Sequence, residues 1–390
     1  MAESTSPLET PQPLNKKLIA AVTAVVFFYW VSLYLYVPTL PVYVQGKVND
    51  LALVGTILSM YGLWQMFSRM PTGIIADWIG RRKPDIFIGL VLTGVGAWIM
   101  SSAQGGSGLL VGRAITGIGA GAWVPLVVLF TSLFPPKELI RATALLTVIN
   151  TLGRMAGTVS TGYLNNLGGY QLAFHLAGAA SLLAIVILVL ITEKRRAVQL
   201  PSLHKLGALF IRPEVLVPSL LSAVLHYGDW TGSFTFFPIL ASRYGAGNVT
   251  LSLLTTLNLA MVLLGNAISA GAAKRLGEKR LLVISFILMG LGLAGGALAP
   301  SLPYVFLAQF AAGCAFGVCY PVLIGMSIKK VDANEQNSAM GLHQSVYALG
   351  MFAGPWLSGL LAKAIGVQPM FGVIAGAILV VGLAGQRLLD

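Results

Sequence analysis

Long apolar segments alternate with short polar gaps from residue 18 almost to the end of the chain. Each segment is close to the roughly 20 apolar residues that a helix needs to cross the ~30 Å hydrocarbon core of a bilayer. The pattern therefore predicts an all-α membrane protein with twelve transmembrane helices. The predicted spans cover residues 18–43, 51–76, 85–103, 107–133, 140–165, 171–192, 214–242, 249–273, 281–299, 303–328, 336–363 and 368–389.

Lys and Arg separate the gaps between these spans into two alternating sets. One set holds nearly all of the basic residues of the gaps, whereas the other holds only Lys47, Arg243 and Lys363. Lys and Arg are enriched in cytoplasmic loops. The sequence therefore predicts a multi-pass protein of the cell (inner) membrane with both termini in the cytoplasm.

The longest gap divides the predicted spans into two groups of six. This gap is basic and places Leu203, Leu206, Leu209 and Phe210 at helical spacing, which is typical of an amphipathic helix on a membrane surface. We therefore predict a cytoplasmic tail (1–17), a six-helix bundle (18–192), a cytoplasmic amphipathic linker (193–213) and a second six-helix bundle (214–390).

The two groups of spans repeat each other at an offset of 196 to 197 residues. The clearest match is a run of three glycines in the fifth and eleventh spans, Gly153, Gly157 and Gly162 against Gly350, Gly354 and Gly359. Further matches in the same register are Pro41 with Pro238, Gly80 with Gly277, and Arg113 with Gln309. Matches in one consistent register predict two pseudo-symmetric bundles.

The gap after the second span has the pattern G-x-x-x-D-x-x-G-R-R-K, from Gly73 through Asp77 and Gly80 to Lys83. It resembles the loop between helices 2 and 3 in the major facilitator superfamily of secondary transporters. The resemblance extends over essentially the whole chain and implies parallel halves with a substrate site between them near the midplane. It also implies a conformational gate formed by Gly73, Asp77, Gly80, Arg81 and Arg82.

The glycine runs resemble the pattern G-x-x-x-G-P-x-x-G-G of the twelve-helix drug/proton antiporters in that superfamily. The fifth span departs from the pattern at Thr158 and Thr161, and the eleventh keeps Pro355 but has Ser358. Small residues three or four apart also let helices approach closely in lipid. Helix packing and an export mechanism therefore explain these glycines equally well.

Asp229 is the only acidic residue near the middle of any predicted span, and His226 lies three residues earlier on the same helical face. Ionisable side chains inside a membrane are expensive and are therefore candidates for function. We predict that Asp229 and His226 couple transport to protons, with a purely structural buried carboxylate as the alternative. The superfamily resemblance adds Arg113, which stands in a glycine-rich pattern similar to a motif whose arginine is implicated in proton transfer.

Aromatic, amide and cationic residues inside the spans suit a mostly apolar pocket with few polar groups. The predicted substrate cavity consists of Tyr34, Trp123, Asn150, Arg154, Trp230, Phe234, Asn258, Gln309, Gln344 and Tyr347. Arg113 and Arg154 outnumber the single midplane acid. They either favour an anionic substrate or neutralise Asp229, and both interpretations stay open at this point.

Composition excludes several other classes of protein. Charged residues make up only 10% of the chain, against about 25% in soluble proteins. The formal charge of +12 is spread over the gaps, so anionic membrane lipids are predicted partners and nucleic acid is not. The sequence has no G-x-x-x-x-G-K-[ST] phosphate loop and no metal-ligand spacing. We therefore predict no enzyme activity, no cofactor and no metal.

These observations predict a secondary active transporter that moves a small organic solute by alternating access. Proton-coupled export, as in multidrug or metabolite efflux, is the favoured form. A proton symporter that imports a sugar or an organic anion is the alternative, and a non-transporting membrane receptor is the alternative of another class. The predicted partners are a small-molecule substrate, protons and membrane lipids, and the resemblance implies a monomer.

Overall fold

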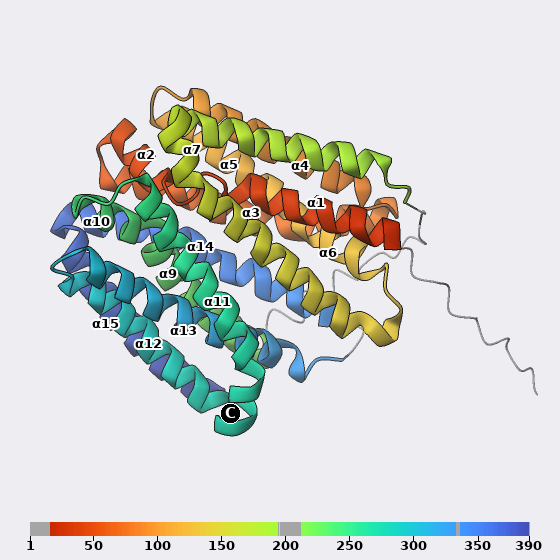
Figure 1. Ribbon diagram of the computed structural model, residues 1–390. Coiled ribbons are helices and arrows are strands. Elements are labelled where there is room, and N and C mark those ends of the chain that lie inside the picture. The colour runs from red at the N-terminus through yellow and green to blue at the C-terminus, as the bar shows by residue number, and fades with distance from the viewer. Residues whose placement is uncertain (1–15, 194, 196–211, 333–335, 390) are drawn as a thin grey trace, which may run out of the picture.

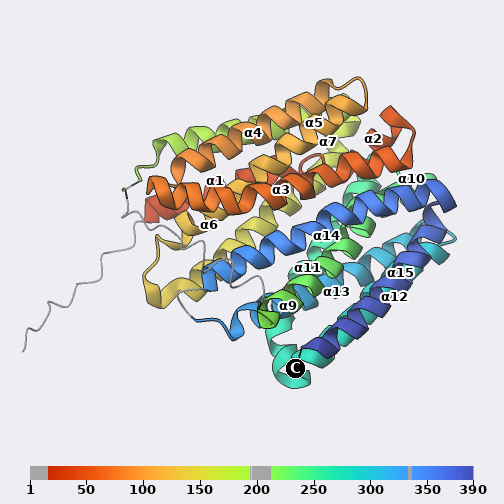
Figure 2. The ribbon, with the colours of Figure 1, turned by 180° about the vertical axis from the view of Figure 1, so that it is seen from behind.

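The computed structural model describes residues 16–193, 195, 212–332 and 336–389, whose regular elements are all helices. Most of the predicted tail and of the amphipathic linker lies outside these residues. The helices form two bundles that lie side by side at the α2 and α10 end and diverge toward the opposite end (Figures 1 and 2).

The N-terminal bundle begins with a crossing built from two helices and ends with one continuous element that crosses twice. Its last element, α7, turns back at Gly168 and Gly169, which have non-helical backbone angles. The elements of this bundle are α1 (Lys16–Tyr34), α2 (Leu40–Val48), α3 (Leu51–Ile79), α4 (Lys83–Ser102), α5 (Gly106–Gly119), η1 (Ala120–Ala122), α6 (Trp123–Thr131), η2 (Pro136–Glu138) and α7 (Leu139–Leu190).

The C-terminal bundle also begins with a broken crossing, in which a π-helical turn, η3, joins two helices. Its elements are α9 (Pro213–Thr231), η3 (Gly232–Phe236), α10 (Phe237–Arg243), α11 (Asn248–Leu276), α12 (Glu278–Leu298), α13 (Leu302–Lys329), α14 (Gln336–Ile365), α15 (Val367–Gly385) and η4 (Gln386–Leu388).

These elements make twelve crossings, as the sequence predicts. Ten described helices are long and apolar enough to span a membrane. The double crossing of α7 and the crossing of α9 with α10 complete the set. The first and seventh crossings are interrupted, and in each the second helix has a proline in its first turn, Pro41 in α2 and Pro238 in α10. Proline lacks the N–H that an uninterrupted helix needs there.

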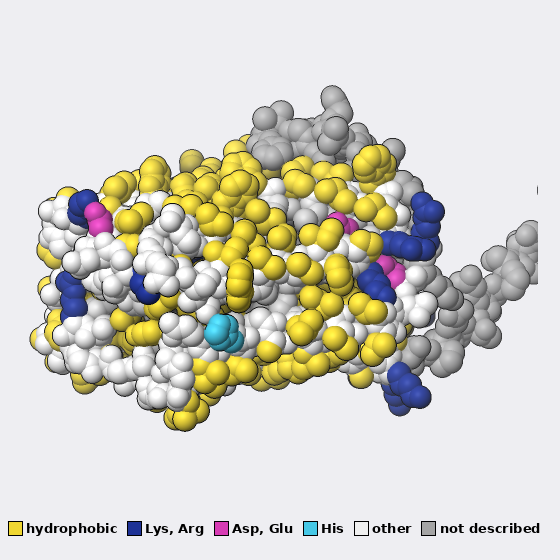
Figure 3. All heavy atoms as spheres, turned by 90° about the horizontal axis from the view of Figure 1, so that it is seen from above, with side chains coloured by type: hydrophobic (Ala, Val, Ile, Leu, Met, Phe, Trp, Pro, Cys, Tyr) yellow, Lys and Arg dark blue, Asp and Glu magenta, His cyan; other side chains and the backbone are white. Residues whose placement is uncertain are grey.

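The ends of the bundles differ in charge. We call the end where α3 meets α4 and α11 meets α12 the basic end, and the end where α2 meets α3 the far end. At the basic end Gly80 and Gly277 both have positive φ, 69° and 83°, a conformation that glycine adopts without strain. In Figure 3 the Lys and Arg side chains lie toward the two ends, and hydrophobic side chains cover the band between them.

The glycine runs of α7 and α14 hold helices together in the same way in both halves. A Cβ added at Gly153 would lie 2.7 Å from the carbonyl oxygen of Phe27 in α1, and one at Gly354 would lie 2.7 Å from that of Tyr227 in α9. The third glycine of each run instead packs across the two halves. Gly162 meets α11, and a Cβ at Gly359 would lie 2.7 Å from the oxygen of Leu51 in α3.

Polar contacts between the halves gather at the far end and in the middle. At the far end Lys363 Nζ lies 2.6 Å from Asp50 Oδ2, and Asn248 donates a hydrogen bond of 2.9 Å to Asn166. At the basic end the ion pairs of the described residues stay within one half, as between Lys329 and Glu278 at 3.0 Å. The far end is therefore the tightly closed side of this conformation.

Candidate substrate-binding and coupling site

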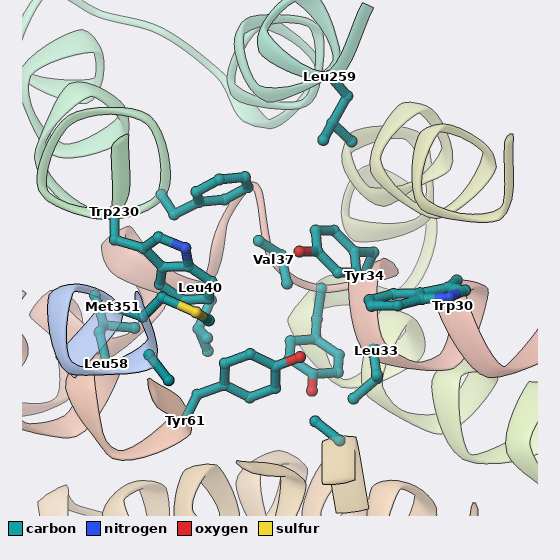
Figure 4. Packing of buried hydrophobic residues seen from close by; sticks show 14 of the residues in the cluster. Trp30, Leu33, Tyr34, Val37, Leu40, Leu58, Tyr61, Trp230, Leu259 and Met351 are labelled. Atoms are coloured by element: carbon teal, nitrogen blue, oxygen red, sulfur yellow. The ribbon is translucent and has the colours of Figure 1, made fainter. Parts of the chain in front are cut away.

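A cavity of about 140 Å³ lies between the two halves. Its walls come from α1, α3, α6 and α7 of the N-terminal half and from α9, η3, α11, α13 and α14 of the C-terminal half. Figure 4 shows Trp30, Tyr34, Tyr61 and Trp230 directed toward one another from these helices. The rings of Tyr61 and Trp230 are stacked across the halves with centroids 5.5 Å apart.

Most of the residues that the sequence assigns to the site line this cavity. The lining includes Asp229 and His226 of the predicted coupling site, and Tyr34, Trp123, Asn150, Arg154, Trp230, Phe234, Asn258 and Tyr347 of the predicted substrate cavity. Gln309 and Gln344 do not line it. Gln309 is fully buried in α13, and the side-chain oxygen of Gln344 accepts a hydrogen bond from Arg69 at 3.2 Å.

Asp229 lies near the middle of the seventh crossing and is 3% exposed. Asn258 of α11 donates one hydrogen bond to Asp229 Oδ1 at 3.2 Å and another to Ser233 Oγ at 2.9 Å. The ion pairs of the described residues do not include Asp229. An amide therefore orients this carboxyl group, and no Lys or Arg of the described residues lies within ion-pair distance of it.

His226 lines the cavity one helical turn before Asp229. Its Nδ1 lies 2.7 Å from the backbone oxygen of Ser222, so that nitrogen carries the proton and donates. The imidazole is stacked on the ring of Tyr347 with centroids 4.1 Å apart, and Phe316 and Tyr320 meet it edge-on. These contacts fix the ring where α9, α13 and α14 meet.

Three arginines of the N-terminal half lie at or near the cavity, of which Arg69 and Arg113 are buried and Arg154 is half-buried. The guanidinium of Arg154 lies 4.4 Å from the ring centre of Tyr34 and 5.7 Å from that of Trp30. Arg113 does not line the cavity but lies 4.4 Å from the ring centre of Tyr61, behind the wall. Arg69 lines it, and none of the three takes part in the ion pairs of the described residues.

Arg69 bridges the two halves on the basic side of the cavity. Its Nη1 donates to the hydroxyl of Tyr347 and to the side-chain oxygen of Gln344, both on α14. The guanidinium also lies 5.2 Å from the ring centre of Tyr347. Arg69, Tyr347 and Gln344 therefore join the two halves by side-chain contacts on the basic side of the cavity.

Sequence reasoning missed several lining residues, which are Trp30, Tyr61, Gln65, Arg69, Val262, Phe316, Tyr320 and Met351. The internal repeat contains a signal for two of them. Tyr61 is the counterpart of Asn258, and Met351 is the counterpart of Arg154, each 197 residues away. A residue predicted to line the cavity in one half therefore points to its counterpart in the other.

The end of α3 and the start of α4 carry the predicted gate residues, which are Gly73, Asp77, Gly80, Arg81 and Arg82. Asp77 Oδ1 lies 3.4 Å from Arg82 Nη2 within the same half. Glu193 accepts hydrogen bonds from the backbone N–H groups of Arg82 and Lys83, at 2.8 and 2.9 Å. In this conformation these contacts tie α3 and α4 to the end of α7.

The repeated bundles around a central cavity agree with a family assignment. The sequence pattern of the Major Facilitator Superfamily matches residues 22–224 and again residues 219–389. The chain belongs to the major facilitator superfamily. It is therefore a multi-pass membrane transporter and not an enzyme.

Curated relatives match most of this major facilitator protein at low identity. The Quinolone resistance protein NorA of Staphylococcus aureus (strain MRSA252) is 23% identical over 350 residues, which cover 86% of this chain and 87% of NorA. The uncharacterized MFS-type transporter MJ1560 of Methanocaldococcus jannaschii is 22% identical over 361 residues, 89% of this chain and 91% of MJ1560.

Solved structures share the fold over nearly the full length. A bacterial homolog to the human lysosomal transporter Spinster, inward-facing and unoccupied, has a TM-score of 0.79 at 17% identity and covers 97% of this chain and 98% of that one. A POT family transporter in complex with 5-aminolevulinic acid has a TM-score of 0.80 at 15% identity, with 94% of each chain covered. At these identities the likeness shows the fold alone.

Proposed function

We propose that the chain is a proton-coupled secondary active transporter that moves a small organic solute by alternating access. The observation that carries the proposal is the buried carboxyl group of Asp229, which lines the cavity between the halves and accepts a hydrogen bond from Asn258. Burial brings the neutral and ionised forms of a carboxyl group closer in free energy. Such a group can bind a proton from one side and release it to the other when the cavity reorients.

Export in exchange for protons is the first form of this proposal. The antiporter-like glycine runs support it, as does the similarity to NorA, a protein named for quinolone resistance. We place the basic end in the cytoplasm because Lys and Arg are enriched on that side of a membrane. As the family resemblance implies, the proposed transporter works as a monomer, and we place it in the cell membrane.

Import together with protons is the second form, and the cavity charges favour it for an organic anion. Two arginines, Arg69 and Arg154, line the cavity together with one carboxyl group, that of Asp229. Neither arginine is in an ion pair among the described residues. An anionic solute would balance this positive charge. In both forms His226 and Arg113 take part in proton coupling. His226 does so from inside the cavity, and Arg113 does so from behind Tyr61.

The test is proton movement in liposomes that contain the purified protein and a trapped pH-sensitive dye. Solutes of different charge are added outside, without an imposed pH gradient. Exchange moves protons against the direction of the solute, and symport moves them with it. Solute binding without flux would mark a receptor and would contradict the proposal.

A further inference from the structure

The wall around Arg154 holds polar atoms that no group of the described residues satisfies. Arg154 Nε, Trp30 Nε1 and Asn150 Oδ1 are buried without a hydrogen-bond partner in the described part of the chain, and Trp30 is only 6% exposed. All three residues line the cavity, on α1 and α7. A buried N–H group without a partner costs free energy that a bound acceptor would recover. Two of these three atoms are donors, so this part of the wall suits an acceptor-rich group.

The charge of the cavity defines that group further. Arg69 and Arg154 supply two positive charges, and Asp229 supplies at most one negative charge. Arg69 is engaged by Tyr347 and Gln344. Arg154 has contacts with ring faces and no carboxylate among the described residues. Arg154 also interacts with the hydroxyl of Tyr34. A guanidinium binds carboxylate with two parallel hydrogen bonds, so Arg154 is the cavity cation that is suited to engage the anionic group of a solute.

The remaining wall suits a flat ring. Trp30 and Trp123 meet edge to face with centroids 5.0 Å apart, and Tyr34 lies 6.2 Å from Phe234 of the other half. Aromatic rings attract one another in offset and edge-on arrangements. The volume of about 140 Å³ is below the 300 to 1,000 Å³ of common drug-sized sites. In this conformation the site therefore suits a compact solute and not a drug-sized one.

We propose that the substrate is a small aromatic carboxylate, whose anionic group binds Arg154 and the indole N–H of Trp30. Its ring lies among Tyr34, Trp123 and Phe234. This inference rests on the proposed function, because it names the substrate class of the same cavity. The carboxylates of Asp229 and the substrate repel each other. The solute therefore binds best when Asp229 carries no charge.

The test compares three probes of one shape by isothermal titration calorimetry on the full-length protein in detergent. The probes are 2-naphthoate, the neutral 2-naphthamide and the cationic 2-naphthylmethylamine. We expect the affinity for 2-naphthoate to exceed that for the amide about 10-fold or more. The reason is that hydrogen bonds to charged groups are stronger than those between neutral groups. Equal binding of the acid and the amide, tighter binding of the amine, or no binding of any probe overturns the proposal.

Variants then locate the binding group. Arg154→Gln is expected to weaken 2-naphthoate binding about 10-fold or more while barely changing the binding of 2-naphthamide. The exposed Arg243 at the far end provides the matched control, since Arg243→Gln removes the same charge outside the cavity. Asp229→Asn is expected to tighten 2-naphthoate binding, and weaker binding in that variant contradicts the repulsion.

Failure of this proposal is distinguishable from failure of the proposed function. Binding of 2-naphthoate without transport in liposomes would refute transport and leave the site assignment intact. Proton-linked transport of another solute by a protein that binds no 2-naphthoate would refute only the substrate class.

Discussion

The two halves repeat the same backbone but carry opposite charges into the cavity. On α7 of the N-terminal half stands Arg154, and its counterpart on α14 is Met351, which lines the same cavity without charge. In the C-terminal half stands Asp229, and its counterpart in α1 is Ser32. Cations therefore come from one half and the acid from the other.

This difference separates two requirements of a transporter. Rocking of two similar bundles around a fixed site needs a repeated scaffold, and the glycines of α7 and α14 provide matching close contacts. Binding a charged solute and a proton needs groups that occur once. The close helix contacts are thus repeated in both halves, whereas each charged group that would bind solute or proton occurs in one half only.

The largest effect is expected from removing the acid of the C-terminal half. Asp229→Asn should abolish accumulation driven by a pH gradient, because the amide cannot carry a proton. It should preserve counterflow, in which labelled solute exchanges for unlabelled solute at equal pH, since exchange requires only reorientation of the cavity. Uptake into vesicles under both conditions measures the two properties, and 2-naphthoate is the first solute to test.

Moving the acid to its counterpart position sharpens this prediction. Ser32→Asp combined with Asp229→Asn places a carboxyl group in α1, where Tyr61 stands at the position that corresponds to Asn258. Without the amide that orients Asp229, accumulation should stay at background. Full recovery would show that any buried acid in the cavity suffices, and retained accumulation in Asp229→Asn alone would make that residue structural.

The fold could be predicted from the sequence because a lipid bilayer constrains the length of apolar segments and the placement of charged residues. Twelve apolar segments, alternating basic gaps and an internal repeat are each visible without a structure, and the family match bears out the fold. The interruptions of the first and seventh crossings were not predicted. Pro41 and Pro238 mark them, but proline also occurs inside continuous helices here, as Pro71 does in α3.

The cavity could be predicted only in part. Asp229 and Arg154 stand out because charge is rare inside spans. The aromatic wall does not stand out, since tyrosine and tryptophan also pack against lipid and against other helices. Tyr61 and Tyr320 line the cavity while Trp64, three residues from Tyr61, is 40% exposed. The orientation of each helix about its axis decides between these roles, and the sequence of one helix does not determine it.

A second large effect is expected at the basic end, where the halves again differ. Asp77 near the end of α3 pairs with Arg82, whereas its counterpart near the end of α11 is Lys274. We predict that Asp77, with Arg81 and Arg82, latches the two halves when the basic end closes. Asp77→Asn should then slow transport by about tenfold, which corresponds to about 1.4 kcal/mol of barrier, with unchanged 2-naphthoate affinity.

The matched control is Lys274→Gln, which removes a charge at the corresponding place in the other half. This variant should keep a nearly normal rate of transport. Initial rates in liposomes and calorimetric affinities measure the two quantities. A normal rate in Asp77→Asn, or equal slowing in both variants, contradicts a latch that depends on the acid.

A smaller effect distinguishes the glycines that pack within one half from those that pack across the halves. Gly359→Ala places a methyl group against Leu51 of the other half, so it should push the far ends apart. Gly354→Ala places one against Tyr227 of the same half, so it should lower the melting temperature instead. Distances between spin labels at Lys47→Cys and Arg243→Cys, in a background without Cys314 and Cys319, report the far end.

The smallest effect is expected from the ion pair that joins the halves at the far end. The hydrogen bond from Lys363 and those from the backbone N–H groups of Leu53 and Ala52 lower the pKa of Asp50 from its ordinary 3.8. Opening the far end removes the Lys363 contribution and lets that pKa rise. The pair therefore favours closure at neutral pH, and this contribution is lost as the pH falls through the lowered pKa.

Acidification from pH 7 to about 3.5 should accordingly lengthen the distance between far-end spin labels slightly, because protonation of Asp50 begins near its ordinary pKa. Exposed ion pairs contribute little, so the shift is expected to be smaller than that of Gly359→Ala. Asp50→Asn and Lys363→Gln should each show the longer distance already at pH 7 and little further change with acid. An acid response in Asp50→Asn that equals that of the unmodified pair would contradict this prediction, because the pH sensitivity would then belong to another group.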